Sequence, residues 1–352
     1  MKGERQMTEP LTIKLKTLTP LWTGGVKGTC DRLHETGIIG SLRWWYEALV
    51  RGLGGSACDP SRHECSYDPK KPHDGLCDVC RVFGATGWRR QFRLEVLDHA
   101  LSNASIEHTI RADRTYTDNK GRTRAPTWYF RDPNRSQRVP NTPKHGELSL
   151  KIQALSSSVS PEVIAGLIQF IADWVAVGAR TQMGFGVVEL ANGRIDTEPL
   201  HDWLSALAGT ETNPKLPSLQ NAFFARIASK NGATEQETFN LKYDLRRLFA
   251  EDRNLRHFVM GTVRGKRLAA KIKMSRPYGN GLIRVWGWIP READVYGSDW
   301  ERNTVVELLH QHLKTRCTLQ VWREFNSPRD TTGQEYDDPT EFLKSLLVSE
   351  SS

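Results

Sequence analysis

The fold is decided by residues 267–289, RLAAKIKMSRPYGNGLIRVWGWI. Arg267–Met274 alternates apolar and polar residues, and Leu282–Ile289 is a second apolar run, so the stretch predicts two consecutive strands. The flanking sequence predicts a strand and a helix before this stretch, then a helix and a strand after it: Phe223–Ile227, Glu235–Ala250, Asp299–Leu313 and Cys317–Trp322. The resulting order, β-α-β-β-α-β, is that of the ferredoxin-like unit.

The first half of the chain fits a decorated version of the same unit. Its predicted elements are a strand over Leu11–Lys16, a helix over Ser41–Arg51 with Ser41 as its cap, a strand over Gln91–Leu97, a helix from Pro161 and a strand over Phe185–Leu190. We therefore expect an α+β fold of two ferredoxin-like (RRM-like) domains with inserted loops, the first heavily decorated. The expected boundaries are an N-terminal domain over 1–195 with Cys-rich and Arg-rich insertions, a linker over 196–220, and a C-terminal domain over 221–352.

The overall charge favours polyanionic partners. Lys and Arg number 49 against 41 Asp and Glu, which gives the 352 residues a formal charge of +8. A soluble basic protein with no anionic partner is the alternative. No apolar run approaches the roughly 18 residues needed to span a bilayer, and the first 20 residues lack the apolar stretch of a signal peptide. We expect a cytoplasmic protein with no membrane partner and with reduced cysteines.

Four cysteines form a candidate metal site. Cys77 and Cys80 have zinc-knuckle spacing, and Cys58 and Cys65 lie upstream in a loop that could fold around a metal. The sequence therefore predicts a structural zinc ion, with His63 or His73 as substitute ligands. Four unligated cytosolic thiols are the alternative.

A glycine-rich segment, Gly178–Gly186, lies between a predicted helix and a predicted strand. A phosphate-binding P-loop needs the reverse order and a Lys-Ser/Thr pair, so nucleoside triphosphate binding is disfavoured. Gly184 and Gly186, with Phe185 between them, allow the backbone to approach a phosphate, and Arg180 supplies a planar cation. An ordinary helix end and tight turn is the alternative.

Other candidate RNA contacts lie in two regions. Gly40 and Ser41 are expected to open a helix with free amides, and Arg43 would bind phosphate beside them; Arg43 could instead pair with Glu47, as an ordinary helical ion pair. Residues 107–144 carry nine Lys or Arg against four acids, with aromatic residues interleaved, as a single-stranded RNA would require. A solvated charged loop is the alternative there. The remaining candidates are Lys27, Trp44, Arg89, Arg90, Arg111, Arg114, Arg122 and Arg124.

The sequence offers little for catalysis. Asp31 and His34 lie in the first glycine-bearing loop, where an Asp beside a phosphate could assist backbone cleavage. No recognised catalytic motif accompanies them, so we predict no catalytic residue and no enzyme.

Four segments together resemble the RAMP superfamily, and specifically the first-numbered subunit of the Cmr module of type III-B CRISPR systems. They are Thr19–Gly25, Glu35–Tyr46, Cys80–Trp88 and Gly178–Gly186. The resemblance is specific in the first 190 residues and weak beyond. It implies two ferredoxin-like domains, with Gly178–Gly186 as the glycine-rich RAMP loop.

The resemblance also implies a function and partners. The protein would be a non-catalytic subunit that caps the effector complex near the 3′ side of the guide RNA. Its partners would be the guide (CRISPR) RNA, the target RNA and the other Cmr subunits. The alternative hypothesis is an endoribonuclease that cuts target or guide-precursor RNA through Asp31, because related backbone subunits use an Asp in a comparable loop. A scaffold with incidental RNA contact is a third.

Overall fold

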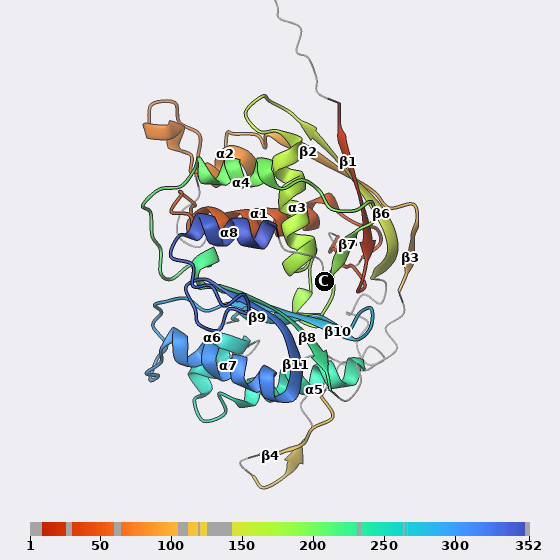
Figure 1. The fold of residues 1–352 in the computed structure, drawn as a ribbon, viewed down its shortest axis with the longest axis vertical. Helices are drawn as coiled ribbons and strands as arrows, with labels where there is room; N and C mark the ends of the chain where they lie inside the picture. The colour runs from red at the N-terminus through yellow and green to blue at the C-terminus, as the bar shows by residue number, and fades with distance from the viewer. Residues whose placement is uncertain are drawn as a thin grey trace, which may run out of the picture.

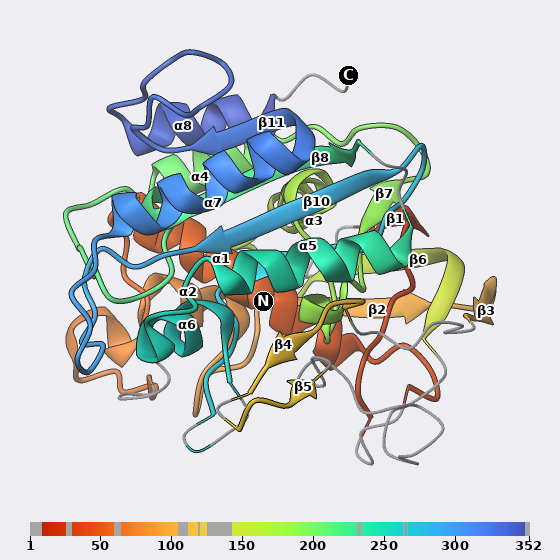
Figure 2. The ribbon, with the colours of Figure 1, turned by 90° about the horizontal axis from the view of Figure 1, so that it is seen from below.

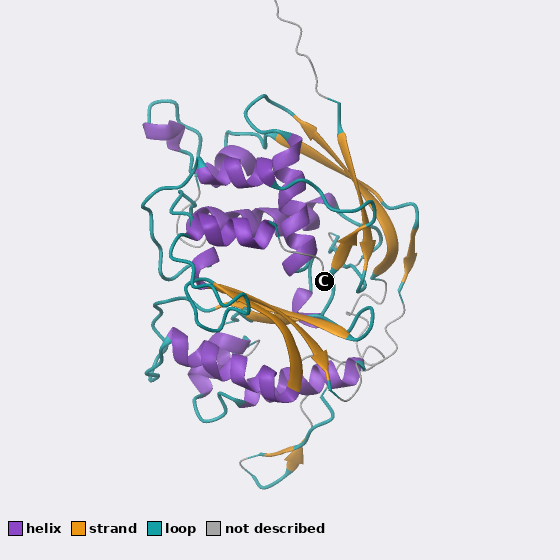
Figure 3. Cartoon of the chain, viewed as in Figure 1, coloured by secondary structure: helices purple, strands orange, loops and turns teal. Residues whose placement is uncertain are grey.

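The computed structural model describes residues 9–25, 30–59, 65–104, 112–118, 120–124, 143–230, 234–262, 265 and 267–348. Two antiparallel sheets and two sets of helices alternate in space (Figures 1 and 3). One layer of helices lies between the two sheets, and a second layer covers the far side of the C-terminal sheet. One face of the N-terminal sheet therefore stays open.

The N-terminal sheet has the ferredoxin-like strand order. It consists of β2 (Phe92–Leu97), β6 (Lys144–Ala154), β1 (Leu11–Thr17) and β7 (Val188–Leu190), in that spatial order, with β3 (Leu101–Asn103) also paired to β6. Helix α1 (Glu35–Gly52) connects β1 to β2, and α3 (Pro161–Trp174) connects β6 to β7. The additions predicted for this domain are thus two insertions, one between α1 and β2 and one between β2 and β6.

The C-terminal sheet confirms the order expected from residues 267–289. Its strands lie in the order β11 (Cys317–Glu324), β8 (Ala222–Ser229), β10 (Leu282–Trp288) and β9 (Ile272–Met274). Helices α5 (Glu235–Arg247), α6 (Arg253–Met260) and α7 (Arg302–Arg316) cover one face, as Figure 2 shows from below. The strand expected from Arg267 begins only at Ile272, because Leu268 instead forms an isolated bridge with Thr262.

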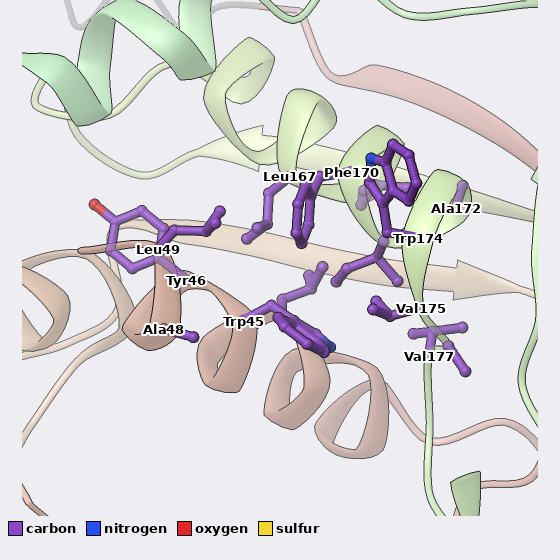
Figure 4. Packing of buried hydrophobic residues seen from close by; sticks show 14 of the residues in the cluster. Trp45, Tyr46, Ala48, Leu49, Leu167, Phe170, Ala172, Trp174, Val175 and Val177 are labelled. Atoms are coloured by element: carbon purple, nitrogen blue, oxygen red, sulfur yellow. The ribbon is translucent and has the colours of Figure 1, made fainter. Parts of the chain in front are cut away.

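The two domains share a core. Trp45 of α1 lies 5.8 Å from Phe170 of α3 and 5.8 Å from Phe224 of β8, measured between ring centroids. The ring centroid of Trp174 of α3 also lies 5.8 Å from that of Phe224. Figure 4 shows Trp45, Phe170 and Trp174 between the two helices. Because α1 and α3 pack on the inner face of the C-terminal sheet, both faces of that sheet are covered by protein.

Two helices that the sequence did not predict reinforce this packing. Helix α4 (Glu198–Ser205) lies within the segment expected to be a linker, and α8 (Pro339–Leu347) near the C-terminus packs on α3 and α4. The Trp174 indole donates to the Leu346 carbonyl oxygen at 2.9 Å. The C-terminal end of the chain therefore covers helices of the N-terminal domain. The remaining short elements are η1 (Pro72–Gly75), α2 (Asp78–Phe83), β4 (Tyr116–Thr117), β5 (Thr123–Arg124), η2 (Thr181–Met183) and η3 (Leu219–Asn221).

The start of α1 corrects one expectation. The helix begins at Glu35, so Gly40 and Ser41 lie inside it and do not offer free helix-terminal amides. The Ser41 hydroxyl accepts from the Gly178 amide at 2.9 Å. It therefore fixes the glycine-rich loop, and does not cap the helix.

Candidate nucleic-acid interface and metal centre

The glycine-rich loop, residues 178–186, lies where the two domains meet. Gly184 and Gly186 both have positive φ, 83° and 89°. Their amides donate to protein carbonyls: Gly184 to Thr181 and Gly186 to Pro20, each at 3.0 Å. These two amides are therefore already used within the protein, which does not support a phosphate cradle made from them.

The space above these glycines is also filled by protein. A Cβ on Gly184 would lie 2.6 Å from the Arg276 amide nitrogen, and one on Gly186 would overlap the Val177 carbonyl oxygen. Phe185 is buried beneath the Arg276 guanidinium, 4.6 Å from its ring centroid, and cannot stack on a base. Gly184 thus allows close packing between the domains and Gly186 close packing against Val177 within the N-terminal domain, which is the tight-turn alternative left open by the sequence.

Arg180 remains a candidate RNA-binding residue. It adopts a left-handed conformation with φ 57°, and its guanidinium lies 4.3 Å from the Trp22 ring centroid. It is half-buried, and burial lowers its pKa. Within the described part of the chain no carboxylate pairs with it, unlike Arg276, which pairs with Glu235. A phosphate oxygen is the partner that a planar cation in this position suits.

Three further cations approach the loop from the C-terminal domain. Lys242 of α5 donates to the Gln182 carbonyl, and Arg276 donates to the Met183 carbonyl and pairs with Glu235. Lys273 of β9 lies 5.3 Å from the Trp44 ring. Burial lowers the pKa of Lys273 to about 8, and burial together with Lys273 and Arg276 lowers that of Lys242 to about 7.

We call Arg180, Lys242, Lys273 and Arg276 the interface cations. The last three were missed by the sequence analysis, because α5 and β9 reach the glycine-rich loop only when the two domains pack together. Trp44 was a candidate and does lie here, half-buried beside Lys273. Lys242 and Arg276 are 2% and 3% exposed, whereas Arg180 and Lys273 are half-buried, so the last two are the cations of this set that a phosphate could reach. Among the described residues, Glu235 pairs with Arg276.

The sheets themselves offer no base-stacking platform of the RRM kind. The open face of the N-terminal sheet carries charged residues such as Lys14, Lys16 and Glu189. Among its strands β1, β2, β6 and β7, the one Phe, Tyr or Trp is Phe92, which is buried. Because the inner face of the C-terminal sheet is covered, RRM-type stacking on either sheet is disfavoured.

The Arg-rich insertion is described in part. Arg114 pairs with Asp244 of α5 at 3.2 Å, so the insertion reaches the C-terminal domain. Arg122 and Arg124 pair with Asp118 in an exposed hairpin. Lys27 and Arg111 lie outside the described residues, as do Trp128, Tyr129 and Phe130 and the arginines Arg131, Arg135 and Arg138.

Three other arginine candidates are engaged with protein oxygen atoms. Arg89 donates to the Leu155 carbonyl and Arg90 to the Phe92 carbonyl. Arg43 pairs with Glu47 at 3.0 Å, which is the alternative that the sequence left open. Exposed Arg89 could still exchange its partner for a phosphate, whereas Arg43 is held by several groups.

The four cysteines come together as predicted. The sulfur atoms of Cys58, Cys65, Cys77 and Cys80 all lie within 4.8 Å of one another. The Cys58 and Cys80 sulfurs are 3.7 Å apart, against about 3.8 Å for two ligands of a tetrahedral zinc ion with 2.3 Å bonds. His73 is exposed and is not part of the group, and His63 lies outside the described residues.

Local hydrogen bonds favour the thiolate form of one of these sulfurs, that of Cys77, and the same bonds among the sulfurs raise the pKa of Cys80. The amides of Cys58 and Cys80 each donate to the Cys77 sulfur at 3.4 Å, and the Cys77 amide donates to Cys65 at 3.4 Å. Hydrogen bonds from the Cys58 and Cys80 thiols, and then these amides, lower the pKa of Cys77 well below its usual range. The cluster can hold a metal ion, and four sulfur ligands would leave no open position for catalysis.

Asp31 lies at the surface. Its carboxylate is 2.8 Å from Nε2 of His34, and this hydrogen bond lowers its pKa. Within the described residues the one group of three or more potential metal ligands is the cysteine cluster, and the Asp31–His34 pair does not belong to it. No helix of the described chain is long and apolar enough to cross a membrane.

A family model of the RAMP superfamily matches residues 14–189, half of the chain. The chain therefore belongs to the RAMP superfamily. No curated protein matches it in sequence.

Three solved structures are similar in fold. The apo form of Cmr1 from Pyrococcus furiosus has 14% identity and a TM-score of 0.49, over 88% of this chain and 97% of that chain. A chain of the type III-B Cmr-beta bound to cognate target RNA and AMPPnP has 12% identity and a TM-score of 0.43, over 87% and 99%. Cmr6 from Pyrococcus furiosus has 15% identity and a TM-score of 0.25, over 51% and 97%.

Proposed function

We propose that this protein is a non-catalytic RNA-binding subunit of a type III-B CRISPR effector complex, located near the 3′ side of the guide RNA. Membership of the RAMP superfamily and the Cmr-like segments at Thr19–Gly25, Glu35–Tyr46, Cys80–Trp88 and Gly178–Gly186 support this assignment. Its partners are the guide RNA, the target RNA and neighbouring RAMP subunits.

The observation that carries the proposal is the set of interface cations around the glycine-rich loop. Arg180 has no carboxylate partner among the described residues, and half-buried Lys273 and buried Arg276 add positive charge from the other domain. A single RNA strand at the domain interface would supply the missing negative charge. Purifying the complex from its host and sequencing the RNA that accompanies it tests the assignment, which predicts CRISPR-derived RNA.

RNA binding by the protein is expected to depend steeply on salt. If the two half-buried cations, Arg180 and Lys273, each neutralise one phosphate, they should contribute about −1.4 to the slope of the logarithm of the association constant against the logarithm of salt concentration. Fluorescence anisotropy with a single-stranded RNA measures this slope. Arg180→Ala should make it shallower by about 0.7, corresponding to one lost phosphate contact.

Lys16→Ala is the matched control for this measurement. Lys16 lies on the open face of the N-terminal sheet and pairs with Glu189 at 3.2 Å, away from the interface cations. It should leave affinity and slope unchanged. Equal effects of the two variants, or an affinity that does not change with salt, would reject the interface cations as the RNA contact.

We also propose that the cysteine cluster binds one structural zinc ion through Cys58, Cys65, Cys77 and Cys80. The sulfur separations fit tetrahedral coordination, and soft thiolates with no open position suit zinc in a structural role. Zinc would then hold the insertion between α1 and β2 in its fold.

The rival function, an endoribonuclease that acts through Asp31, predicts a different outcome for one variant. We expect the assembled complex carrying Asp31→Ala to cut target RNA at the wild-type sites and rates, because among the described residues this exposed carboxylate pairs with His34 and with no second metal ligand. Gel analysis of the cleavage products tests this expectation. Loss of one product would favour the nuclease.

A further inference from the structure

Arg43 is held by the cysteine cluster and its surroundings. Its Nη2 donates to the Cys80 sulfur at 3.2 Å, Nη1 to the Gly84 carbonyl at 3.1 Å, and Nε to Glu47 at 3.0 Å. Its side chain is 32% exposed. These three hydrogen bonds use three of the five N–H donors of the guanidinium and fix its orientation toward the cluster.

Cys80 depends on this contact. The backbone amides that point at the cluster donate to Cys65 and Cys77, and Cys77 accepts two of them. Cys80, which is 1% exposed, receives its hydrogen bond from Arg43. Among the described residues, Arg43 is therefore the N–H donor that orients this one sulfur.

The contact between Arg43 and Cys80 also matters for the charge of the metal site. Four thiolates around a divalent zinc ion carry a net charge of 2−, and such a charge in a partly buried site needs compensation. Among the described residues, Arg43 is the cation that donates a hydrogen bond to a cluster sulfur. Its guanidinium keeps its positive charge at any physiological pH.

A chain of side chains extends this contact along α1. Glu47, which accepts from Arg43 through one oxygen, accepts through the other from Arg51 at 3.3 Å. Arg51 also donates to the Cys58 carbonyl at 3.0 Å. Cys58 and Cys80 are thus both tied to α1 by the Arg43–Glu47–Arg51 chain.

We propose that Arg43 is a positioning residue of the metal centre: it orients Cys80 and offsets the negative charge of the zinc–thiolate group, and it does not contact RNA. This inference rests on the proposed zinc site. It replaces the phosphate-binding role that the sequence suggested for Arg43.

The test compares Arg43→Gln with Arg81→Gln in the full-length protein. Arg81 belongs to the same insertion, but its guanidinium lies near Asp74, at 3.9 Å, and touches no sulfur. Zinc affinity is measured by competition with a chromogenic chelator, and the coordination geometry by the absorption spectrum of the cobalt(II)-substituted protein. RNA affinity of each zinc-loaded variant is measured alongside.

We expect Arg43→Gln to weaken zinc binding about 10- to 100-fold, the usual effect of removing a group that supports a ligand. Its cobalt spectrum should remain that of four thiolates, its RNA affinity should equal wild type when zinc is loaded, and Arg81→Gln should stay within about twofold of wild type in zinc affinity. Arg43→Lys keeps the charge and should recover part of the affinity, so it serves if the glutamine variant does not fold.

The contrary outcomes separate the two hypotheses. Wild-type zinc affinity in Arg43→Gln, or weaker RNA binding by its zinc-loaded form, overturns the role of Arg43 while leaving the zinc site in place. Wild-type protein that binds no zinc overturns both.

Discussion

Alanine in place of Gly184 should lower the free energy of unfolding by about 2 to 5 kcal/mol. Two causes act together. The residue adopts φ 83°, which is strained for any residue with a Cβ, and that Cβ would lie 2.6 Å from the Arg276 amide nitrogen of the other domain. Because the obstructing atom belongs to the backbone, it cannot move aside cheaply. Urea titration of the full-length protein measures the change.

Gly193→Ala separates the two causes. Gly193 has nearly the same backbone conformation, φ 86°, but an added Cβ would meet no atom within 4 Å. This variant should lose only the strain energy, about 1 to 2 kcal/mol. The excess loss in Gly184→Ala then measures how closely the domains pack at the glycine-rich loop. Equal losses would contradict a packing role, and an RNA-binding defect in a Gly184→Ala protein of normal stability would revive the phosphate cradle.

Regular alternation allowed most of the fold to be predicted from sequence. The order β8-α5-β9-β10-α7-β11 was expected because its strands are short apolar or alternating stretches separated by helical patterns. Strand β6 was missed although Leu148, Leu150 and Ile152 alternate in it, since its first residues continue the polar Arg-rich insertion. Helix α8 was also missed, because its buried face contacts α3 and α4, far away in sequence.

In the candidate site, too, some residues could be identified from the sequence and others only from the structure. Sequence spacing identified the cysteine cluster because its ligands lie within one insertion. Lys242 and Lys273 could not be identified, because only domain packing brings α5 and β9 to Gln182 and Trp44. For Arg43 the sequence offered two partners, and only the structure shows the third, a sulfur of the cluster. Packing between segments that are distant in the sequence thus decides which residues join the site when the local sequence pattern does not.

Removal of zinc should destabilise the N-terminal domain and lower the melting temperature by at least about 5 °C. A structural ion present at a thousand times its dissociation constant stabilises the folded state by about 4 kcal/mol, and chelation removes that stabilisation. Residues 56–88 should lose protection first, since the cluster closes this insertion and Arg43 and Arg51 tie it to α1. Elemental analysis should find about one zinc per chain before chelation, and hydrogen exchange should show the local loss after it.

Cys80→Ala and Cys317→Ala are the paired variants for this prediction. Both residues are buried free thiols, at 1% and 4% exposure, but Cys317 lies in the separate core of the C-terminal domain. Cys80→Ala should purify without stoichiometric zinc and melt like the chelated protein, and added zinc should not restore it. Cys317→Ala should keep its zinc, should lose stability only through the lost core contact, and should still respond to chelation. Identical zinc content and melting in the two variants would show that the four sulfurs meet without holding a metal, because the loss would then reflect only a missing buried thiol.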